Sequence, residues 1–332
     1  MALLALVSGC GPRDAAAASP VASGASAADG PYRVFQEPDA GIAPLIDLIG
    51  RAKQLLRLAI YQLADSDVVQ ALLDARARGV AVHVLLDAAY HGRAANVGAY
   101  DRLAAGGVDV QWASPTVLFH EKVLIQDDAA ALIGTGNISK KFRATARDFW
   151  IEDRRADEVA AIAATIDQDM RRSPGDRLAP AVEAGALVWS PARADVLRLI
   201  SDARQSLDLM TEEFTDRTVA AAVARAAARG VRCRVVMSEN PASAEVLSRL
   251  VAAGCVAHVY PVTSTGLYFH AKQLRVDGTL LIGSQNLSPT SLLSNRELSV
   301  RLTAETAPNL LSAVAAAFER DFEGQAGSAS TR

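Results

Sequence analysis

The sequence predicts an α/β protein that consists of two tandem α/β/α domains, each built on a mixed sheet. Strand-like segments alternate with helical segments along most of the 332 residues, which is typical of a sheet covered by helices on both faces. The order of these segments repeats between the two halves of the chain. A short polar motif also occurs twice, and in each half it opens a pair of strands joined by a tight turn. These tight pairs predict antiparallel strands beside the parallel ones in each sheet.

The first half begins with a helix and a strand, followed by an amphipathic helix and a buried strand. Asp65 or Ser66 is expected to cap the amphipathic helix, since both side chains accept hydrogen bonds from free backbone amides. Gly79 is expected to end it, because glycine readily adopts the left-handed conformation that follows many helices. The predicted ranges are a helix over 46–56, a strand over 55–63, a helix over 66–78 and a strand over 80–86.

The second half repeats this plan, and its amphipathic helix again ends at a glycine, Gly230. A third helix and strand follow in each half, directly before the polar motif. The predicted ranges are a helix over 192–203, a strand over 207–214, a helix over 216–229 and a strand over 231–237.

A break in helical character separates the halves. The sequence predicts a helix over 156–170, and the Ser-Pro-Gly run at 173–175 interrupts the pattern that follows. These features predict one domain over residues 31–172 and a second over 173–324. Residues 325–332 are rich in small and polar side chains and are expected to form a flexible tail.

The duplicated motif places a histidine and a lysine two positions apart. His120 and Lys122 form the first pair, and His270 and Lys272 form the second, 150 positions later. Since side chains alternate along a strand, each histidine shares a face with its lysine. A second strand and a polar loop follow each pair. An imidazole and an ammonium on one face, near hydroxyl and amide groups, favour an oxyanion such as phosphate. The loop residues are Thr135 and Asn137 in the first copy, and Ser284 and Asn286 in the second.

The two motifs read His-x-Lys-x4-Asp, and each is followed by Gly-Ser/Thr-x-Asn. This pattern resembles the signature of the phospholipase D superfamily, and the resemblance covers nearly the whole chain after about residue 31. It implies two domains related by a pseudo-two-fold axis, with the active site at the interface between them. It also implies that His120 attacks phosphorus to form a phosphohistidine and that His270 protonates the leaving oxygen. Because the halves are nearly symmetric, the reverse assignment stays open.

The resemblance also implies roles for the remaining motif residues. Lysines and loop residues would bind the phosphate oxygens, and one acidic residue in each half would orient a histidine. Two aspartates complete the motifs, and the analogy gives them more weight in holding the fold, as hairpin-turn residues, than in catalysis. No cofactor is implied, and no set of residues has the spacing of metal ligands. The phosphate-binding set is Lys122, Lys272, Asn137, Asn286, Thr135 and Ser284; the orienting acids are Asp148 and Glu297; the motif aspartates are Asp127 and Asp277; Tyr61 and Glu212, at corresponding strand ends, are further candidates.

The N-terminus has the character of an export signal. Residues 7–10 read Val-Ser-Gly-Cys, which resembles a bacterial lipobox with Cys10 as the lipidated residue. An ordinary secretory signal and a disordered leader are the alternatives. The segment up to residue 30 is expected to tether a protein on the periplasmic side of a membrane. Cys233 and Cys255 could pair in that oxidising compartment, or remain buried as free thiols.

The overall composition sets limits on the substrate. The net charge is −3, so the chain lacks the basic excess that is usual for nucleic-acid binders. A membrane anchor favours a lipid, and we expect a monomeric phospholipase D-type hydrolase of phospholipid head groups. A nuclease of the same superfamily is one alternative, and a phosphatidyl transferase of the cardiolipin synthase-like type is another. A binding lipoprotein without catalysis is the third, which two complete motifs make the least favoured.

Overall fold

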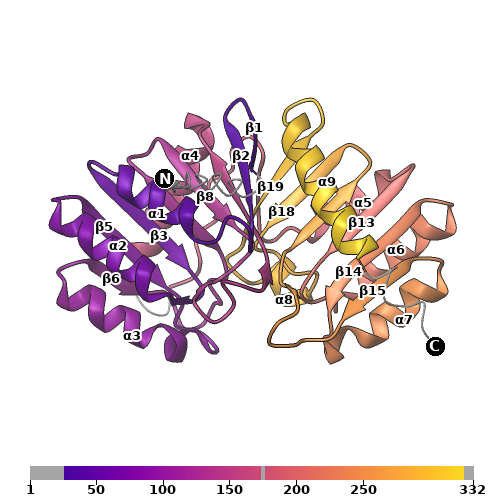
Figure 1. Ribbon diagram of the computed structural model, residues 1–332, viewed down its shortest axis with the longest axis horizontal. Coiled ribbons are helices and arrows are strands. Elements are labelled where there is room, and N and C mark those ends of the chain that lie inside the picture. Colours follow the sequence, from indigo (N-terminus) through magenta and orange to yellow (C-terminus); the bar gives the residue numbers. More distant parts are fainter. Residues whose placement is uncertain (1–25, 173–175, 325–332) are drawn as a thin grey trace, which may run out of the picture.

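The computed structural model describes residues 26–172 and 176–324. The predictions about the lipobox at Cys10, residues 1–25 and the tail over 325–332 therefore lie outside the described residues. Figure 1 shows two halves side by side, each with a sheet flanked by helices. Both sheets contain parallel and antiparallel neighbours. The predicted fold class, two α/β/α domains with mixed sheets, is confirmed.

The first half contains an eight-stranded sheet in which three parallel strands adjoin antiparallel ones. β3, β5 and β6 are parallel, and β7 runs antiparallel to β3. The motif forms the hairpin of β7 and β8, as the sequence predicts. In sheet order the strands are β1 (Ser26–Asp29), β2 (Tyr32–Gln36), β11 (Phe149–Asp153), β8 (Ala130–Gly134), β7 (Lys122–Gln126), β3 (Leu55–Ile60), β5 (Ala81–Leu86) and β6 (Asp109–Trp112).

The second half contains a seven-stranded sheet with the same arrangement. Three parallel strands again adjoin a motif hairpin, formed here by β17 and β18. In sheet order the strands are β12 (Leu187–Trp189), β19 (Leu298–Thr303), β18 (Thr279–Gly283), β17 (Gln273–Val276), β13 (Ser206–Met210), β14 (Arg232–Ser238) and β15 (Val256–Tyr260).

Helices cover both faces of each sheet (Figure 1). Asp65 caps α2 and Asp216 caps α6, since each carboxylate accepts hydrogen bonds from two amides of the first turn. The helices are α1 (Ala43–Arg51), α2 (Ser66–Ala77), α3 (Gly92–Ala105) and α4 (Ala156–Met170) in the first half, and α5 (Arg193–Asp202), α6 (Arg217–Ala228), α7 (Ala244–Ala252), the short α8 (Pro289–Leu293) and α9 (Pro308–Glu323) in the second. Among the residues that the structure describes, no helix is long and apolar enough to cross a membrane.

One apolar core runs through both halves and joins them. It contains side chains of α4, such as Ile162, together with side chains of α9, such as Phe318. Phe119 and Phe269, which directly precede the two histidines, are also buried in it. A separate apolar cluster lies under the outer helices of each half. The motif histidines therefore directly follow residues of the apolar core that joins the two halves.

The structure differs from the sequence-based expectation at the first strand. The expected flexible tether extends to residue 30, but Ser26–Asp29 form β1 at the edge of the first sheet. The strand is held by backbone pairing with β2 and by Asp29, whose carboxylate accepts hydrogen bonds from Leu310 N at 2.6 Å and Asn309 Nδ2 at 2.8 Å. Small side chains carry no apolar alternation, so the sequence gives no sign of this strand.

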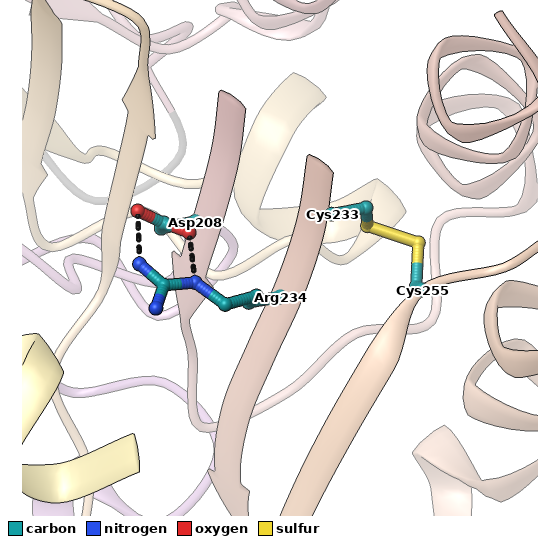
Figure 2. The surroundings of a disulfide bond; sticks show 4 residues. All are labelled: Asp208, Cys233, Arg234 and Cys255. Carbon is teal, nitrogen blue, oxygen red and sulfur yellow. Dashed lines mark hydrogen bonds and ion pairs between the residues drawn. A yellow bond between two sulfur atoms is a disulfide. The ribbon is translucent and has the colours of Figure 1, made fainter. Parts of the chain in front are cut away.

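A disulfide joins Cys233 of β14 to Cys255, which directly precedes β15. The two Cα atoms are 4.6 Å apart, and both residues are buried. Figure 2 shows Cys233 and its neighbour Arg234 on opposite sides of β14, where Arg234 pairs with Asp208 of β13 at 2.7 and 3.0 Å. Of the two alternatives that the sequence leaves open, the structure has the paired one.

Candidate active site

Backbone hydrogen bonds hold each histidine segment to the opposite half. The amides of His120 and Glu121 both donate to the carbonyl of Arg296, and the amides of His270 and Ala271 both donate to the carbonyl of Arg147. Short parallel pairing continues the contact, between β10 (Ala146–Arg147) and β16 (Tyr268–Phe269) on one side and between Phe119 and Arg296 on the other. The two contacts are equivalent, so the histidines lie on either side of a pseudo-two-fold axis.

Each histidine is oriented by a carboxylate from the other half. His120 Nδ1 lies 2.9 Å from Glu297 Oε2, and His270 Nδ1 lies 3.1 Å from both carboxylate oxygens of Asp148. Both imidazoles are 7% exposed. A carboxylate at Nδ1 fixes the ring and leaves Nε2 for chemistry. The acids that the sequence singles out are thus placed at the histidines, and the structure adds that the pairing is crosswise.

The carboxylates have partners of their own. Glu297 Oε1 accepts from Ser291 Oγ at 2.6 Å and from Asn295 Nδ2 at 3.1 Å. Asp148 Oδ1 accepts from Thr135 Oγ1 at 2.6 Å. Ser291 and Asn295 gave no signal in the sequence, because only the turn after α8 brings them back to Glu297.

Two loop hydroxyls have a different role from the predicted phosphate contact. Thr135 Oγ1 donates to Asp148 and accepts from Phe149 N at 2.9 Å, while Ser284 Oγ accepts from Leu298 N at 3.0 Å. Both side chains are fully buried. They hold the backbone and the carboxylate of the orienting strands, so the loop groups that stay available for a phosphate contact are the asparagine amides.

The two lysines differ in their partners. Lys122 is completely buried, and its Nζ donates to the carbonyl of His120. Burial, together with the nearby charge of Lys272, lowers the pKa of Lys122 to about 7. Lys272 Nζ likewise donates to the carbonyl of His270, at 2.5 Å, but it also forms an ion pair of 2.9 Å with Glu212 Oε2 and lies 3.1 Å from His270 Nε2. The second half therefore has a carboxylate among its catalytic cations, and the first half has none at the corresponding place.

Electrostatics also distinguishes the histidines. Burial lowers the pKa of His120, while Glu297 opposes this shift. Burial would raise the pKa of Glu297, but the charges of His120 and Lys122 hold it below its ordinary value. His270 contacts two carboxylates, Asp148 at Nδ1 and Glu212 at Nε2, the second at 3.2 Å. Among the described residues, His270 thus contacts two carboxylates and His120 contacts one.

The loop asparagines lie at the mouth of the site. Asn286 Nδ2 is 3.5 Å from Glu212 Oε2, and Asn137 Nδ2 is 3.5 Å from Gln62 Oε1. Their contacts are long, so both amides can exchange them for a bound anion. Asn137 and Asn286 are thus placed where the sequence predicts phosphate contacts.

The motif aspartates lie away from the histidines. Asp127 accepts hydrogen bonds from the backbone amides of residues 53–55, and Asp277 accepts three from residues 204–206, all at 2.8–2.9 Å. Each occupies a hairpin turn with a positive φ, 51° at Asp127 and 48° at Asp277. They tie the turn to the start of β3 or β13. These contacts are those of hairpin-turn residues, the role to which the family analogy gives more weight than to catalysis.

Two cavities adjoin the histidines, with volumes of about 240 Å³ and about 230 Å³. Tyr61 and Glu212 border both cavities and so divide them. The first contains His270 and has an apolar wall, and the second contains His120 and is lined mainly by polar groups. The apolar wall consists of Ile42, Leu45, Ile138, Phe142 and Trp150, and the polar lining includes Asn240, Asn286, Ser288, Thr290 and Asn295.

Solved structures of other proteins are similar to this chain in fold. The crystal structure of phosphatidylserine synthase from Haemophilus influenzae Rd KW20 has a TM-score of 0.67 and 14% identity, over 88% of this chain and 86% of that one. The crystal structure of polyphosphate kinase from Porphyromonas gingivalis has a TM-score of 0.61 and 16% identity, over 87% of this chain. The match covers 50% of the kinase, so this chain spans about half its length. At these identities the similarity is one of fold alone.

Sequence comparison gives the family. No curated protein sequence matches the chain. A family model described as "Cardiolipin synthase, PLD-like domain" matches residues 45–170 and again residues 196–324, one segment in each half. Together the two segments include both histidine motifs and most of the chain. The chain belongs to the phospholipase D superfamily.

Proposed function

We propose that the protein is a phospholipase D-type phosphodiesterase that cleaves the head group from phospholipids through a phosphohistidine on His120. The observation that carries the proposal is the pairing of two buried histidines, each with its own carboxylate at Nδ1, across one site. Such a pair supplies both a nucleophile and an acid, which a phosphodiester requires because an alkoxide leaves poorly.

The reaction has two displacements. In the first, Nε2 of neutral His120 forms a bond to phosphorus while the bond to the leaving oxygen breaks and His270 Nε2 gives that oxygen its proton. In the second, His270 takes a proton from water, the water oxygen bonds to phosphorus, and the bond to His120 breaks. Lys122, Lys272 and the asparagine amides stabilise the charge on the non-bridging oxygens.

Three observations support a lipid substrate. The cavity beside His270 has an apolar wall of about five side chains that an acyl-bearing or other apolar group could contact. The net charge of −3 gives no general attraction to nucleic acid. The matched family model is that of a lipid-synthesising enzyme. A nuclease with the same residues in the same roles is the outcome if oligonucleotides are cleaved and phospholipid vesicles are not.

Phosphatidyl transfer is a second candidate, favoured by the description of the family model. The same intermediate serves both reactions, since an alcohol can replace water in the second displacement. Ethanol should therefore divert product from phosphatidic acid to phosphatidylethanol. With two substrates that differ in head group, the product ratio at fixed ethanol should be equal, because the intermediate no longer contains the head group. A ratio that follows the head group would exclude a common intermediate.

The place of action follows from the same proposal. The buried disulfide between Cys233 and Cys255 supports an oxidising compartment, and the lipobox-like residues 7–10 support a lipid anchor at Cys10. Fractionation of cells that express the parent and a Cys10→Ala variant tests the anchor. Equal membrane association of both proteins would remove it from the proposal.

A further inference from the structure

Glu212 places a carboxylate among the groups that the reaction needs for phosphate. Its Oε2 lies 2.9 Å from Lys272 Nζ, 3.2 Å from His270 Nε2 and 3.5 Å from Asn286 Nδ2. One oxygen thus contacts all three phosphate-directed donors of the second half. A non-bridging phosphate oxygen would require the same partners.

The carboxylate is held in this place. Tyr268 donates to Glu212 Oε1 at 3.0 Å, and the side chain of Glu212 is 27% exposed while that of Lys272 is 2% exposed. Glu212 therefore lies above the lysine, at the wall between the two cavities. Burial would raise the pKa of Glu212, but the charges of His270 and Lys272 hold it well below its ordinary value. The residue remains a charged neighbour of any anion that enters.

The corresponding position of the first half carries no charge. Tyr61 lies there, with its ring centroid 5.0 Å from that of His120 and 5.5 Å from Lys122 Nζ. Burial raises the pKa of the Tyr61 hydroxyl, so the phenol stays neutral. The negative charge of Glu212 is thus a property of one half, and the shared fold does not require it.

This charge matters for the kind of phosphate that the site accepts. Asp148 and Glu297 are engaged at Nδ1 of the histidines, and among the described residues Glu212 is the carboxylate that contacts both Lys272 Nζ and His270 Nε2. A phosphodiester carries one negative charge. A phosphomonoester carries nearly two above pH 7, since its second pKa is about 6. At a separation of a few ångströms the second charge is repelled strongly.

We propose that Glu212 is a specificity-determining residue that lets the site bind a monoanionic phosphodiester and disfavours a dianionic phosphomonoester. The inference rests on the proposed function in one respect: both place the phosphate among Lys272, His270 and Asn286. It has a consequence for turnover, because hydrolysis converts a diester into a monoester. Glu212 then promotes the release of the phosphatidic acid product.

Calorimetric binding of two small anions at pH 8 tests the proposal without any lipid. The anions are inorganic phosphate, mainly a dianion at this pH, and dimethyl phosphate, a monoanion. In Glu212→Gln, phosphate should bind more tightly by about tenfold or more, while dimethyl phosphate should gain only about threefold. Glu212→Asp keeps the charge and should keep most of the preference for the diester.

The matched control is Glu305→Gln, which removes an exposed carboxylate in the turn after β19. It should bind both anions as the parent does. Equal gains for both anions in Glu212→Gln, or no gain for either, would overturn the role of Glu212. If neither the parent nor any variant binds either anion, the proposed phosphate site itself is refuted. That result differs from a failure of the role of Glu212 alone. Thermal unfolding followed by circular dichroism verifies that each variant is folded.

Discussion

The two halves of the molecule have the same scaffold but different charges around the site. The scaffold contacts are repeated almost atom for atom, as in the crosswise backbone bonds at the histidines and the triple amide contacts of Asp127 and Asp277. Corresponding positions that differ near the histidines include four pairs: Tyr61 and Glu212, Asp87 and Ser238, Glu121 and Ala271, Asp148 and Glu297.

One of these pairs makes the same backbone contact in both halves. Asp87 Oδ1 accepts from Phe119 N at 2.7 Å, and Ser238 Oγ accepts from Phe269 N at 2.8 Å. Two different side chains thus hold the residue before each histidine in the same way. Tyr61/Glu212 and Glu121/Ala271 replace a carboxyl group by an uncharged side chain in one half, whereas Asp148/Glu297 changes only the length of the acidic side chain. The duplicated scaffold thus places two histidines in equivalent positions, and these differences give the two histidines different surroundings.

The largest expected effect comes from removing the histidines one at a time. Either His120→Ala or His270→Ala should lower kcat by about 10³-fold or more, since each group has its own chemical step. A diester with a p-nitrophenyl leaving group separates the roles of the two histidines, because this leaving group needs little protonation. With it, His270→Ala should still form a phosphoryl adduct on His120, whereas His120→Ala should form none. Intact-protein mass spectrometry and peptide mapping measure the adduct.

The reverse result would exchange the two roles. An adduct on His270 in the His120→Ala protein would make His270 the nucleophile. Glu305→Gln serves as the control, because its exposed carboxylate lies in the turn after β19. Substantial turnover of a natural lipid by either histidine variant would contradict the two-histidine mechanism itself.

Much of the site could be predicted from the sequence because the motif is local. His120 and Lys122 are two positions apart on one strand segment, so their shared face follows from strand geometry. The helices over 66–78 and 156–170 are close to α2 and α4, since caps and apolar periodicity are also local signals. The role of the hairpin-turn aspartates follows from turn chemistry.

The remaining features depend on packing between distant segments. The crosswise pairing of His120 with Glu297 arises from the interface of the halves, about which residue spacing gives no information. The contact of Tyr268 with Glu212 joins two segments of the second half that are 56 residues apart in the sequence. The register of β14 beside β15 decides whether Cys233 and Cys255 can meet, and register is a tertiary property. The sequence does not predict β1, because backbone hydrogen bonds hold this strand and its side chains show no apolar pattern.

The disulfide gives the next largest expected effect, and it concerns one half only. Val82 and Val108 stand at the positions of the first half that correspond to Cys233 and Cys255. Replacing both cysteines by valine copies the first half and removes the cross-link over 22 residues. The free energy of unfolding, measured in urea, should fall by about 3 kcal/mol. A reducing agent should lower the stability of the parent by a similar amount and leave that of the double variant unchanged. Equal stability of the oxidised parent, the reduced parent and the double variant would contradict the cross-link.

The orienting acids should give a smaller and unequal effect on activity. Glu297→Gln and Asp148→Asn keep the shape of each side chain and remove its charge, and a loss of about 10–100-fold in kcat is expected. The loss should be greater for Glu297→Gln. His270 keeps Glu212 when Asp148 is neutralised, whereas His120 has no second carboxylate contact in the part of the chain that the structure describes. Equal losses would show that Glu212 does not support His270. Ser291→Ala, which removes a donor to Glu297, should cost only a few-fold.

The smallest expected effect concerns Glu121, for which the second half has Ala271. Glu121 is fully buried, and neither of its carboxylate oxygens has a hydrogen-bond partner among the described residues. Burial, reinforced by the charge of Asp169, raises its pKa well above the ordinary value, although Arg296 acts in the opposite direction. The second half achieves the same backbone contact with an alanine at this position. The scaffold therefore does not need a carboxyl group at this position.

The raised pKa has a defined consequence for stability. Below the unfolded pKa of about 4.3 the carboxyl group is protonated in both states, so Glu121→Gln should match the parent there. As the pH rises toward the folded pKa, the unfolded state ionises first and the parent loses stability that Glu121→Gln keeps. At pH 8 the variant should be more stable by about 1–3 kcal/mol in urea unfolding. If the free energy of unfolding has the same pH dependence in both proteins, Glu121 ionises normally in the folded state and pairs with Arg296. The first half would then contain a salt bridge at this position, and not a buried neutral acid.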